Sequence, residues 1–340
     1  MEDFVFENST KAYFGKKAVS RYLPDLLKQY GPNVMLAYGG GSIKRNGIYD
    51  EVMAILKAAG KTVTEFAGIM SNPTYAKVLE GAAAARKCHA DLILAVGGGS
   101  VFDCCKAIAL AAVYDGDVWA DFWAKAGTID FPTVPLGIIL TVSGTGSEMN
   151  GGAVITNEDL KVKTGRDYPA LNAKFAILDP LYTLSVPHKQ FVSGAFDSLS
   201  HMMEIYFSAP DTDNVSDSMN EALMKSVVRN LRAALRNPED YNARSNLVWL
   251  SISWNTPWAP TRTATTAAAC PCCIRSITAT SIRTGPPSSP ASQPGCGISR
   301  QQGRAKKNWP RKAWKPWRPS SRKSACRRPC GSWACRTKAC

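Results

Sequence analysis

The last 100 residues of this 340-residue sequence lack acidic residues, and the last 90 also lack most large aliphatic ones. No Asp or Glu follows Asp240, and no Leu, Val, Met, Phe or Tyr follows Leu250. A segment of this composition cannot bury enough apolar surface to offset the chain entropy lost on folding. We therefore expect no packed domain over residues 257–340.

The positive charge is confined to the same end. Residues 1–240 contain all 27 acidic residues against 23 Lys and Arg, a balance of −4, whereas residues 241–340 carry 18 Lys and Arg and no acid. The overall charge of +14 would suggest a nucleic-acid partner. Because the main body of the chain is mildly acidic, that interpretation does not apply to it.

Three interpretations of residues 257–340 compete. Eight of the 11 Cys lie from Cys270 onward and could form a disulfide or zinc module. However, no His follows His201, and the cysteine spacings match no common zinc site. Four Trp among basic residues could instead bind single-stranded nucleic acid. Enrichment in Arg, Pro, Cys, Ser and Trp is also typical of a GC-rich gene read out of frame. We favour this last interpretation, in which the tail is disordered or frameshifted.

The first 250 residues contain no signal peptide and no membrane span. The N-terminus is acidic, and apolar runs such as 135–142 are far too short to cross a bilayer. Only three Cys occur in this part, which is typical of free thiols in a reducing compartment. We therefore expect a cytoplasmic protein without a membrane partner.

Strand and helix patterns alternate over residues 1–187. Short apolar runs predict strands, and the segments between them have helical spacing or helix-opening residues. This alternation predicts a doubly wound α/β domain with a mostly parallel sheet, which binds ligands at the carboxyl ends of its strands. The predicted strands are 34–38, 62–66, 91–96, 137–142, 153–156 and 175–178, and the predicted helices are 49–59, 73–87 with Pro73 in the first turn, and 100–113.

The run Gly97-Gly98-Gly99-Ser100 joins a buried strand to a helix. Glycines let a ligand approach the backbone, and we expect Ser100 to cap the helix with Asp103 three residues later. The exposed N–H groups of such a helix start suit a pyrophosphate. The alternative is an ordinary tight turn, because the spacing is not that of the usual dinucleotide fingerprint.

Two further segments suit nucleotide binding. The turn Gly39–Arg45 contains Ser42, Lys44 and Arg45 but no acid, which favours NADP over NAD because an acid near the ribose would exclude a 2′-phosphate. The segment Thr141–Glu148 combines hydroxyls and glycines that suit phosphate and ribose oxygens. Each segment alone could equally be a solvated loop.

Asp197 and His201 are the candidate metal ligands. At i and i+4 they project from one face of a helix predicted to begin near Pro187, so that both can reach one metal ion. An isolated pair of this kind is more often a surface ion pair.

Together these motifs resemble the iron-containing, or group III, alcohol dehydrogenases, over residues 4 to about 255. The similarity is strongest to the NADP-dependent butanol dehydrogenase and aldehyde reductase branch. It implies a dinucleotide-binding domain at 1–187, the start of an all-helical metal-binding domain at 188–256, and a family-like homodimer. It also implies roles for single residues: Gly98, Gly99 and Ser100 at the pyrophosphate, Gly40 and Ser42 near the 2′-phosphate, Asp103, Thr141, Thr145 and Lys163 along the cofactor, and Asp197 and His201 at the metal.

The implied reaction is hydride transfer between NADP(H) and a small primary alcohol or aldehyde, with Fe²⁺ or Zn²⁺ as a Lewis acid. The family supplies two more histidines to the metal, and this sequence has none after His201. We therefore expect impaired activity. The alternatives are a non-catalytic NADP-binding remnant of a frameshifted gene and, less favoured, a nucleic-acid-binding protein that uses its tail.

Overall fold

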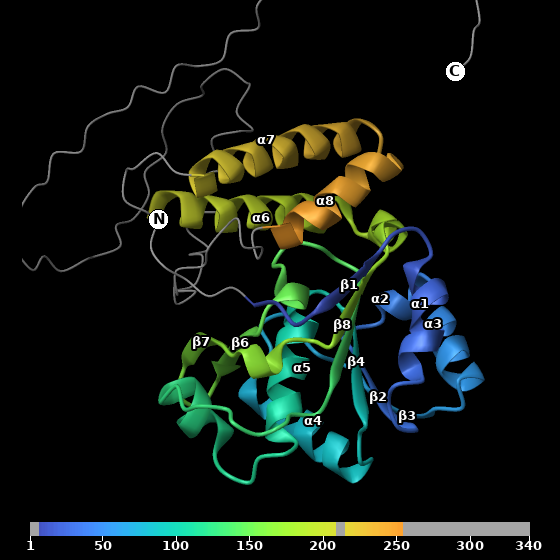
Figure 1. Ribbon diagram of the computed structural model, residues 1–340, viewed down its shortest axis with the longest axis vertical. Helices are drawn as coiled ribbons and strands as arrows, with labels where there is room; N and C mark the ends of the chain where they lie inside the picture. The colour runs from blue at the N-terminus through green and yellow to red at the C-terminus, as the bar shows by residue number, and fades with distance from the viewer. Residues whose placement is uncertain (1–6, 209–214, 254–340) are drawn as a thin grey trace, which may run out of the picture. The chain divides into compact units, whose positions relative to one another are not determined.

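The computed structural model describes residues 7–208 and 215–253, and a parallel sheet lies between helices in the part that precedes residue 188 (Figure 1). Its six strands lie in the order β1-β8-β5-β4-β2-β3, and every neighbouring pair is parallel. The predicted α/β domain with a parallel sheet is confirmed. The strands are β1 (Lys11–Phe14), β2 (Asn33–Tyr38), β3 (Thr62–Phe66), β4 (Leu92–Gly97), β5 (Leu136–Leu140) and β8 (Phe175–Leu178).

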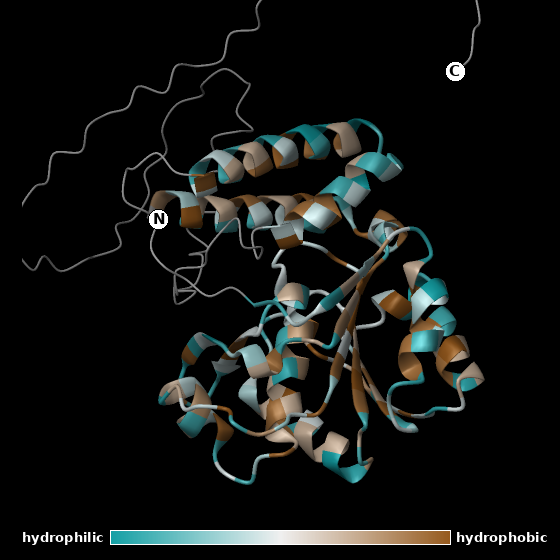
Figure 2. Cartoon of the chain, in the orientation of Figure 1, coloured by the Kyte–Doolittle hydropathy of each residue, from teal (hydrophilic) through white to brown (hydrophobic). Residues whose placement is uncertain are grey.

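Helices cover both faces of the sheet. On one face lie α1 (Ala18–Leu27) and α3 (Ile48–Ala58), and on the other lie α4 (Tyr75–Lys87) and α5 (Gly99–Ala111). Strand β4 is covered by helices on both faces: Leu94 packs toward α1 and α3, and the next residue, Ala95, packs toward α4 and α5. For this reason its sequence is apolar throughout. The most hydrophobic ribbon therefore lies in the sheet, between the two helical layers (Figure 2).

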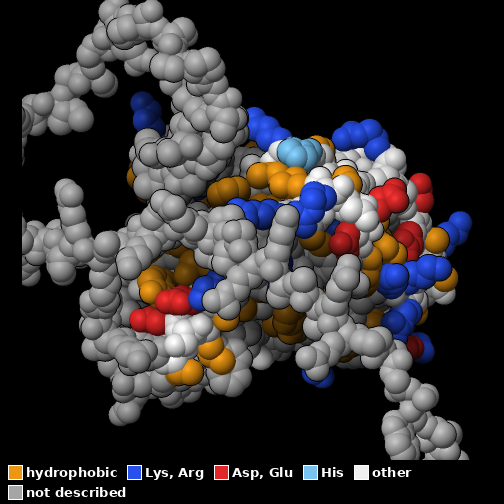
Figure 3. Space-filling model, turned by 90° about the horizontal axis from the view of Figure 1, so that it is seen from above, with side chains coloured by type: hydrophobic (Ala, Val, Ile, Leu, Met, Phe, Trp, Pro, Cys, Tyr) orange, Lys and Arg blue, Asp and Glu red, His pale blue; other side chains and the backbone are white. Residues whose placement is uncertain are grey.

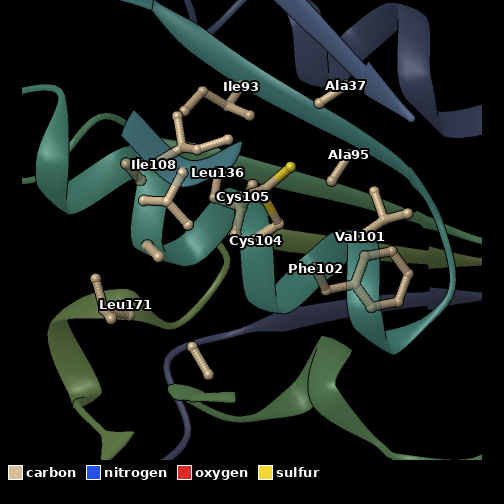
Figure 4. Packing of buried hydrophobic residues seen from close by; sticks show 14 of the residues in the cluster. Ala37, Ile93, Ala95, Val101, Phe102, Cys104, Cys105, Ile108, Leu136 and Leu171 are labelled. Carbon is tan, nitrogen blue, oxygen red and sulfur yellow. The ribbon is translucent and has the colours of Figure 1, made fainter. Parts of the chain in front are cut away.

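Helix α5 packs its apolar side against the strands. Phe102, Cys104 and Cys105 lie among residues of β2, β4 and β5 in this core (Figure 4). Burial raises the pKa of Cys104 to about 12 and raises that of Cys105 well above its usual value. Both thiols therefore stay protonated and act as small apolar side chains.

The segment predicted as a strand at 153–156 is not part of the main sheet. It lies in β6 (Gly152–Asn157), which pairs antiparallel with β7 (Val162–Asp167) in a separate hairpin. Alternating burial along β6 shows that only one of its faces is covered. The remaining short elements are α2 (Ser42–Arg45), η1 (Trp119–Ala124), η2 (Ser147–Met149), η3 (Pro169–Leu171) and η4 (Pro180–Ser185).

Two helix starts differ from the prediction. Thr74 caps α4 by accepting a hydrogen bond from the Lys77 N–H at 3.2 Å, so Pro73 precedes the helix instead of lying in its first turn. Gly98, in an extended conformation, is the N-cap of α5, and the predicted cap Ser100 lies one residue inside the helix. The Asp103 carboxylate does not complete a capping box there, because it accepts hydrogen bonds from another loop.

Beyond η4 the described chain is helical. The helices α6 (His188–Ser208), α7 (Val215–Arg236) and α8 (Tyr241–Ser253) share one hydrophobic cluster. Arg244 of α8 is buried with its guanidinium 3.7 Å from the centroid of the Phe191 ring, and it donates a hydrogen bond to the Thr183 carbonyl at 3.0 Å. Arg244 thereby connects α6 and α8 to η4 and the α/β part.

Part of the helical region carries exposed apolar side chains. Phe207 is 75% exposed and Val215 is 51% exposed. Figure 3 shows the molecule from above the view of Figure 1, and on that face hydrophobic side chains lie next to Lys and Arg of the described residues. None of the described helices is long and apolar enough to span a membrane. The predicted tail, 257–340, lies outside the described residues, as does the end of the predicted 188–256 domain.

Candidate cofactor and metal site

The two glycine turns lie side by side at the carboxyl end of the sheet. Gly39 follows β2 and Gly98 follows β4, and these strands are hydrogen-bonded neighbours. The chain passes from β2 to β3 on one side, and β4 lies on the other side of β2. This reversal of strand order is a switch point, where doubly wound sheets bind nucleotides.

The turn before α5 has the features expected of an anion site. No side chain of the described residues caps the helix at Gly98, so its first N–H groups remain available to a ligand. Gly99 is required here because a Cβ atom would overlap the side chain of Thr145. The structure therefore brings Gly98, Gly99, Ser100 and Thr145 together at the start of α5.

A short loop after β5 connects this turn to α6. The Thr141 N–H donates to the Gly97 carbonyl at 2.8 Å, which fixes the start of the loop against β4. At its other side, the Ser198 hydroxyl of α6 donates to the Gly144 carbonyl at 3.1 Å. Gly194 allows this close approach, because a Cβ atom there would overlap the Ser143 carbonyl oxygen.

Behind the loop lies a polar network that the sequence analysis missed. Lys106 of α5 is fully buried, and its ammonium donates to the Ser147 carbonyl at 2.6 Å and to three more oxygens of Ser147, Asn150 and Gly152. Burial lowers the pKa of Lys106 to about 8, although Asp103 opposes this. The available sequence signal was a lysine among the buried apolar residues of α5, three positions after Asp103.

Asp103 belongs to this network. Its carboxylate accepts hydrogen bonds from the Ser147 hydroxyl at 2.6 Å and from the Val154 N–H at 3.1 Å. These contacts join α5 to η2 and β6, so the structure gives Asp103 a role in holding the loop. Lys163, on β7, is exposed and donates to the Asn72 side-chain oxygen at 2.7 Å. Its charge also lowers the pKa of Asp103, which burial raises more strongly.

The turn after β2 is open to solvent and lies beside an acid that the sequence analysis did not consider. Gly40 and Ser42 are exposed. The Glu65 carboxylate, near the end of β3, accepts a hydrogen bond from Tyr38 at 2.5 Å and contacts the Lys44 ammonium at 3.3 Å. No acid is present within the turn itself, but the fold places one next to it.

A small hollow lies directly beyond this turn. It has a volume of about 250 Å³ and separates the start of α3 from η4. Inside it, the Tyr182 hydroxyl donates to Glu51 at 2.7 Å. The hollow is smaller than a typical ligand pocket and could enclose only part of a dinucleotide. Its lining is Asn46, Gly47, Ile48, Glu51, Leu181, Tyr182, Leu184 and Ser185.

Asp197 and His201 lie on one side of α6, as predicted, next to the loop after β5. A Cβ atom on Gly144 would lie 3.3 Å from Asp197 Oδ2, so Asp197 is in contact with the loop. The distance from Asp197 Oδ2 to His201 Nε2 is 3.9 Å, and both side chains are mostly buried. Burial raises the pKa of Asp197, and His201 partly offsets this.

The pair fits two positions of a divalent-metal site but does not complete one. A carboxylate oxygen and an imidazole nitrogen suit Fe²⁺ or Zn²⁺, and 3.9 Å lets both approach one ion after a small adjustment. Catalytic sites generally need three protein ligands. Within residues 7–208 and 215–253, no group of three His, Cys, Asp or Glu side chains is placed to hold a metal.

Comparison with known proteins gives two matching family models. Residues 9–180 match the family model described as iron-containing alcohol dehydrogenase, and residues 191–252 match the C-terminal model of the same family. The chain belongs to the iron-containing alcohol dehydrogenase family.

Among its relatives is the probable NADH-dependent butanol dehydrogenase 1 of Bacillus subtilis, 44% identical over 73% of this chain and 64% of the relative. The NADPH-dependent aldehyde reductase YqhD of Escherichia coli is 34% identical over 73% of this chain and 64% of the relative. Among solved structures, the NADH-dependent butanol dehydrogenase A of Thermotoga maritima matches with a TM-score of 0.70 and 38% identity, over 74% of this chain and 63% of that one. The match thus spans about 64% of the length of these curated relatives.

Proposed function

We propose that this chain is a metal-dependent alcohol dehydrogenase or aldehyde reductase that transfers a hydride between NADP(H) and a small primary alcohol or aldehyde. One observation carries the proposal: a single loop contacts both halves of the candidate site. Thr145 lies against Gly99 in the cofactor turn, and Gly144 lies against Asp197. A pyrophosphate at the turn and a metal ion at Asp197 would therefore be neighbours across one short loop.

The proposal assigns a role to each of these residues. The first N–H groups of α5 and the hydroxyls of Ser100 and Thr145 would bind the cofactor phosphates, and Asp197 and His201 would hold the metal. A divalent metal supplies a Lewis acid for the substrate oxygen when it is bound. The names of the relatives include butanol dehydrogenases and an aldehyde reductase, which supports a small alcohol or aldehyde as substrate.

We further propose that NADP is preferred to NAD, because the turn after β2 contains Ser42, Lys44 and Arg45 and no acid. The names of the relatives divide between NADH and NADPH, so they do not decide this preference. A homodimer and a cytoplasmic location complete the proposal.

A second candidate function is NADP binding without efficient catalysis. It is favoured by the two-ligand metal site of the described residues and by the composition of residues 257–340, which suggests a frameshift. A metal held by one carboxylate and one imidazole binds weakly and is poorly oriented. We therefore expect the chain to bind NADPH but to turn over slowly.

The test uses the purified full-length chain. NADPH binding is measured by fluorescence, and oxidation of NADPH by butanal is measured with added Fe²⁺ or Zn²⁺. We expect saturable NADPH binding, loss of that binding in Gly99→Val, whose side chain would overlap Thr145, and turnover well below about 1 s⁻¹. Absence of NADPH binding would reject the cofactor site. Turnover of about 1 s⁻¹ or more would reject the impairment.

A further inference from the structure

The carboxylate of Glu65 is the centre of a polar cluster beside the turn Gly39–Arg45. The Tyr38 hydroxyl donates to Oε2 at 2.5 Å and the Tyr49 hydroxyl donates to Oε1 at 2.7 Å. The Lys44 ammonium contacts Oε2 at 3.3 Å. Each of the four residues comes from a different element, namely β2, α2, α3 and β3. The cluster exists because the fold places Glu65 of the edge strand opposite Leu36, near the end of β2.

Lys44 is held by this cluster from more than one side. Its ammonium lies 4.3 Å from the centroid of the Tyr49 ring, in addition to its contact with Glu65. Tyr38 and then Glu65 raise the pKa of Lys44, while Tyr38, Tyr49 and then Lys44 lower the pKa of Glu65. Both groups are therefore charged at neutral pH, and their charges cancel.

We infer that Glu65 sets the choice between NADPH and NADH by compensating the positive charge of Lys44, which lies two residues after Ser42 in the turn. This inference rests on the proposed function, in which the turn receives the adenosine ribose. A 2′-phosphate carries a charge between about −1.5 and −2 at neutral pH, so it is attracted by an uncompensated Lys44 and repelled by Glu65. Glu65 thus reduces the preference for NADPH over NADH below what the composition of the turn alone would give.

The experiment is a double-mutant cycle on the full-length chain. Dissociation constants for NADPH and NADH are measured by fluorescence titration for the wild type, Glu65→Gln, Lys44→Gln and the double variant. Removing the acid should raise the NADPH-to-NADH affinity ratio about tenfold, the scale of one charge interaction with a phosphate at a solvated site. Lys44→Gln alone should lower the ratio, because it leaves the negative charge of Glu65 uncompensated, and the double variant should return to about the wild-type ratio.

Two further measurements separate this effect from a structural one. High salt should reduce the gain in Glu65→Gln, because exposed charges are screened. Glu221→Gln is the matched control: Glu221 of α7 also accepts from a tyrosine, Tyr206, and a lysine, Lys225, each at 3.1 Å, but lies in the helical region. This variant should leave the ratio unchanged.

The possible failures are distinct. If the wild type binds neither cofactor, the proposed function is rejected and this inference with it. If both cofactors bind and Glu65→Gln leaves the ratio unchanged, only this inference is rejected. It is also rejected if Glu65→Gln weakens the binding of NADH alone, and to the same extent in the presence of Lys44→Gln. Glu65 would then contact the ribose directly.

Discussion

Glu148 imposes a pH-dependent cost on the folded chain, and this cost can be measured. Its side chain is 1% exposed, and Oε1 has no hydrogen-bond partner in the described structure. Burial raises the pKa of Glu148 from 4.5 to about 7, although the nearby Lys106 opposes the shift. Glu148→Gln removes the ionisable group and keeps the shape of the side chain, so it isolates this electrostatic term.

The sign and size follow from linkage. Between pH 4.5 and 7 the folded state binds a proton at Glu148 that the unfolded state has released, so the free energy of unfolding falls as the pH rises. The contribution is fully present below pH 4.5 and is lost as the pH passes through 7. A shift from 4.5 to about 7 corresponds to about 3 kcal/mol. The glutamine variant should lack this loss.

Urea unfolding of the full-length chain between pH 5 and 7.5 gives the measurement. The wild type should lose about 2 kcal/mol more than Glu148→Gln over this interval, because part of the effect lies below pH 5. The two proteins are compared by the slope of the free energy of unfolding against pH. Their absolute stabilities are not compared, because the buried amide of the new glutamine has unpaired hydrogens that cost stability at every pH. Glu158→Gln, at an exposed turn, is the control and should follow the wild type. Parallel pH profiles for wild type and Glu148→Gln would refute the argument.

Two further predictions concern the framework around the loop. Lys106→Met leaves Asp103 without its nearby cation and leaves buried oxygens without a donor. Urea unfolding should therefore show a loss of about 3–5 kcal/mol in the free energy of unfolding. The control Lys125→Met, at an exposed position, should cost less than about 1 kcal/mol. Gly194→Ala places a methyl group against the Ser143 carbonyl oxygen. It should lower the free energy of unfolding by about 1–3 kcal/mol, even though alanine favours helices. The control Ser193→Ala, exposed on the same helix, should be neutral or stabilising. A Gly194→Ala variant more stable than the wild type would contradict the close approach.

The α/β fold was predictable because its signals are local. The apolar run at 91–96 and the glycines after it predict a buried parallel strand followed by a helix, and β4 and α5 lie there. The predicted strands 62–66 and 175–178 coincide with β3 and β8. The first strand and helix, β1 and α1, were missed, since the amphipathic α1 contains Pro24 and β1 has only four residues. The pairing of β6 with β7 was also missed, because periodicity predicts a strand but not its neighbour.

The candidate site was predictable only in part for the same reason. Gly99 and Asp197 were found through motifs that are contiguous in the sequence. Glu65 and Lys106 were missed because their significance depends on tertiary contacts, with Tyr38 27 residues away and with Ser147 41 residues away. An acid-free turn in the sequence is thus not an acid-free site in the fold.

The position of Asp197 depends on the α/β part as much as on the helices that follow it. Its helix is held against the loop after β5 by the contact between Gly194 and Ser143 and by the hydrogen bond from Ser198 to Gly144. The same loop is anchored at its start by the hydrogen bond from Thr141 to Gly97. These contacts all lie within the described residues, and together they hold Asp197 next to the loop that packs against the turn before α5. The described residues place no third His, Cys, Asp or Glu beside Asp197 and His201. On the proposed function, we therefore expect activity to depend on completing the metal site and not on positioning Asp197.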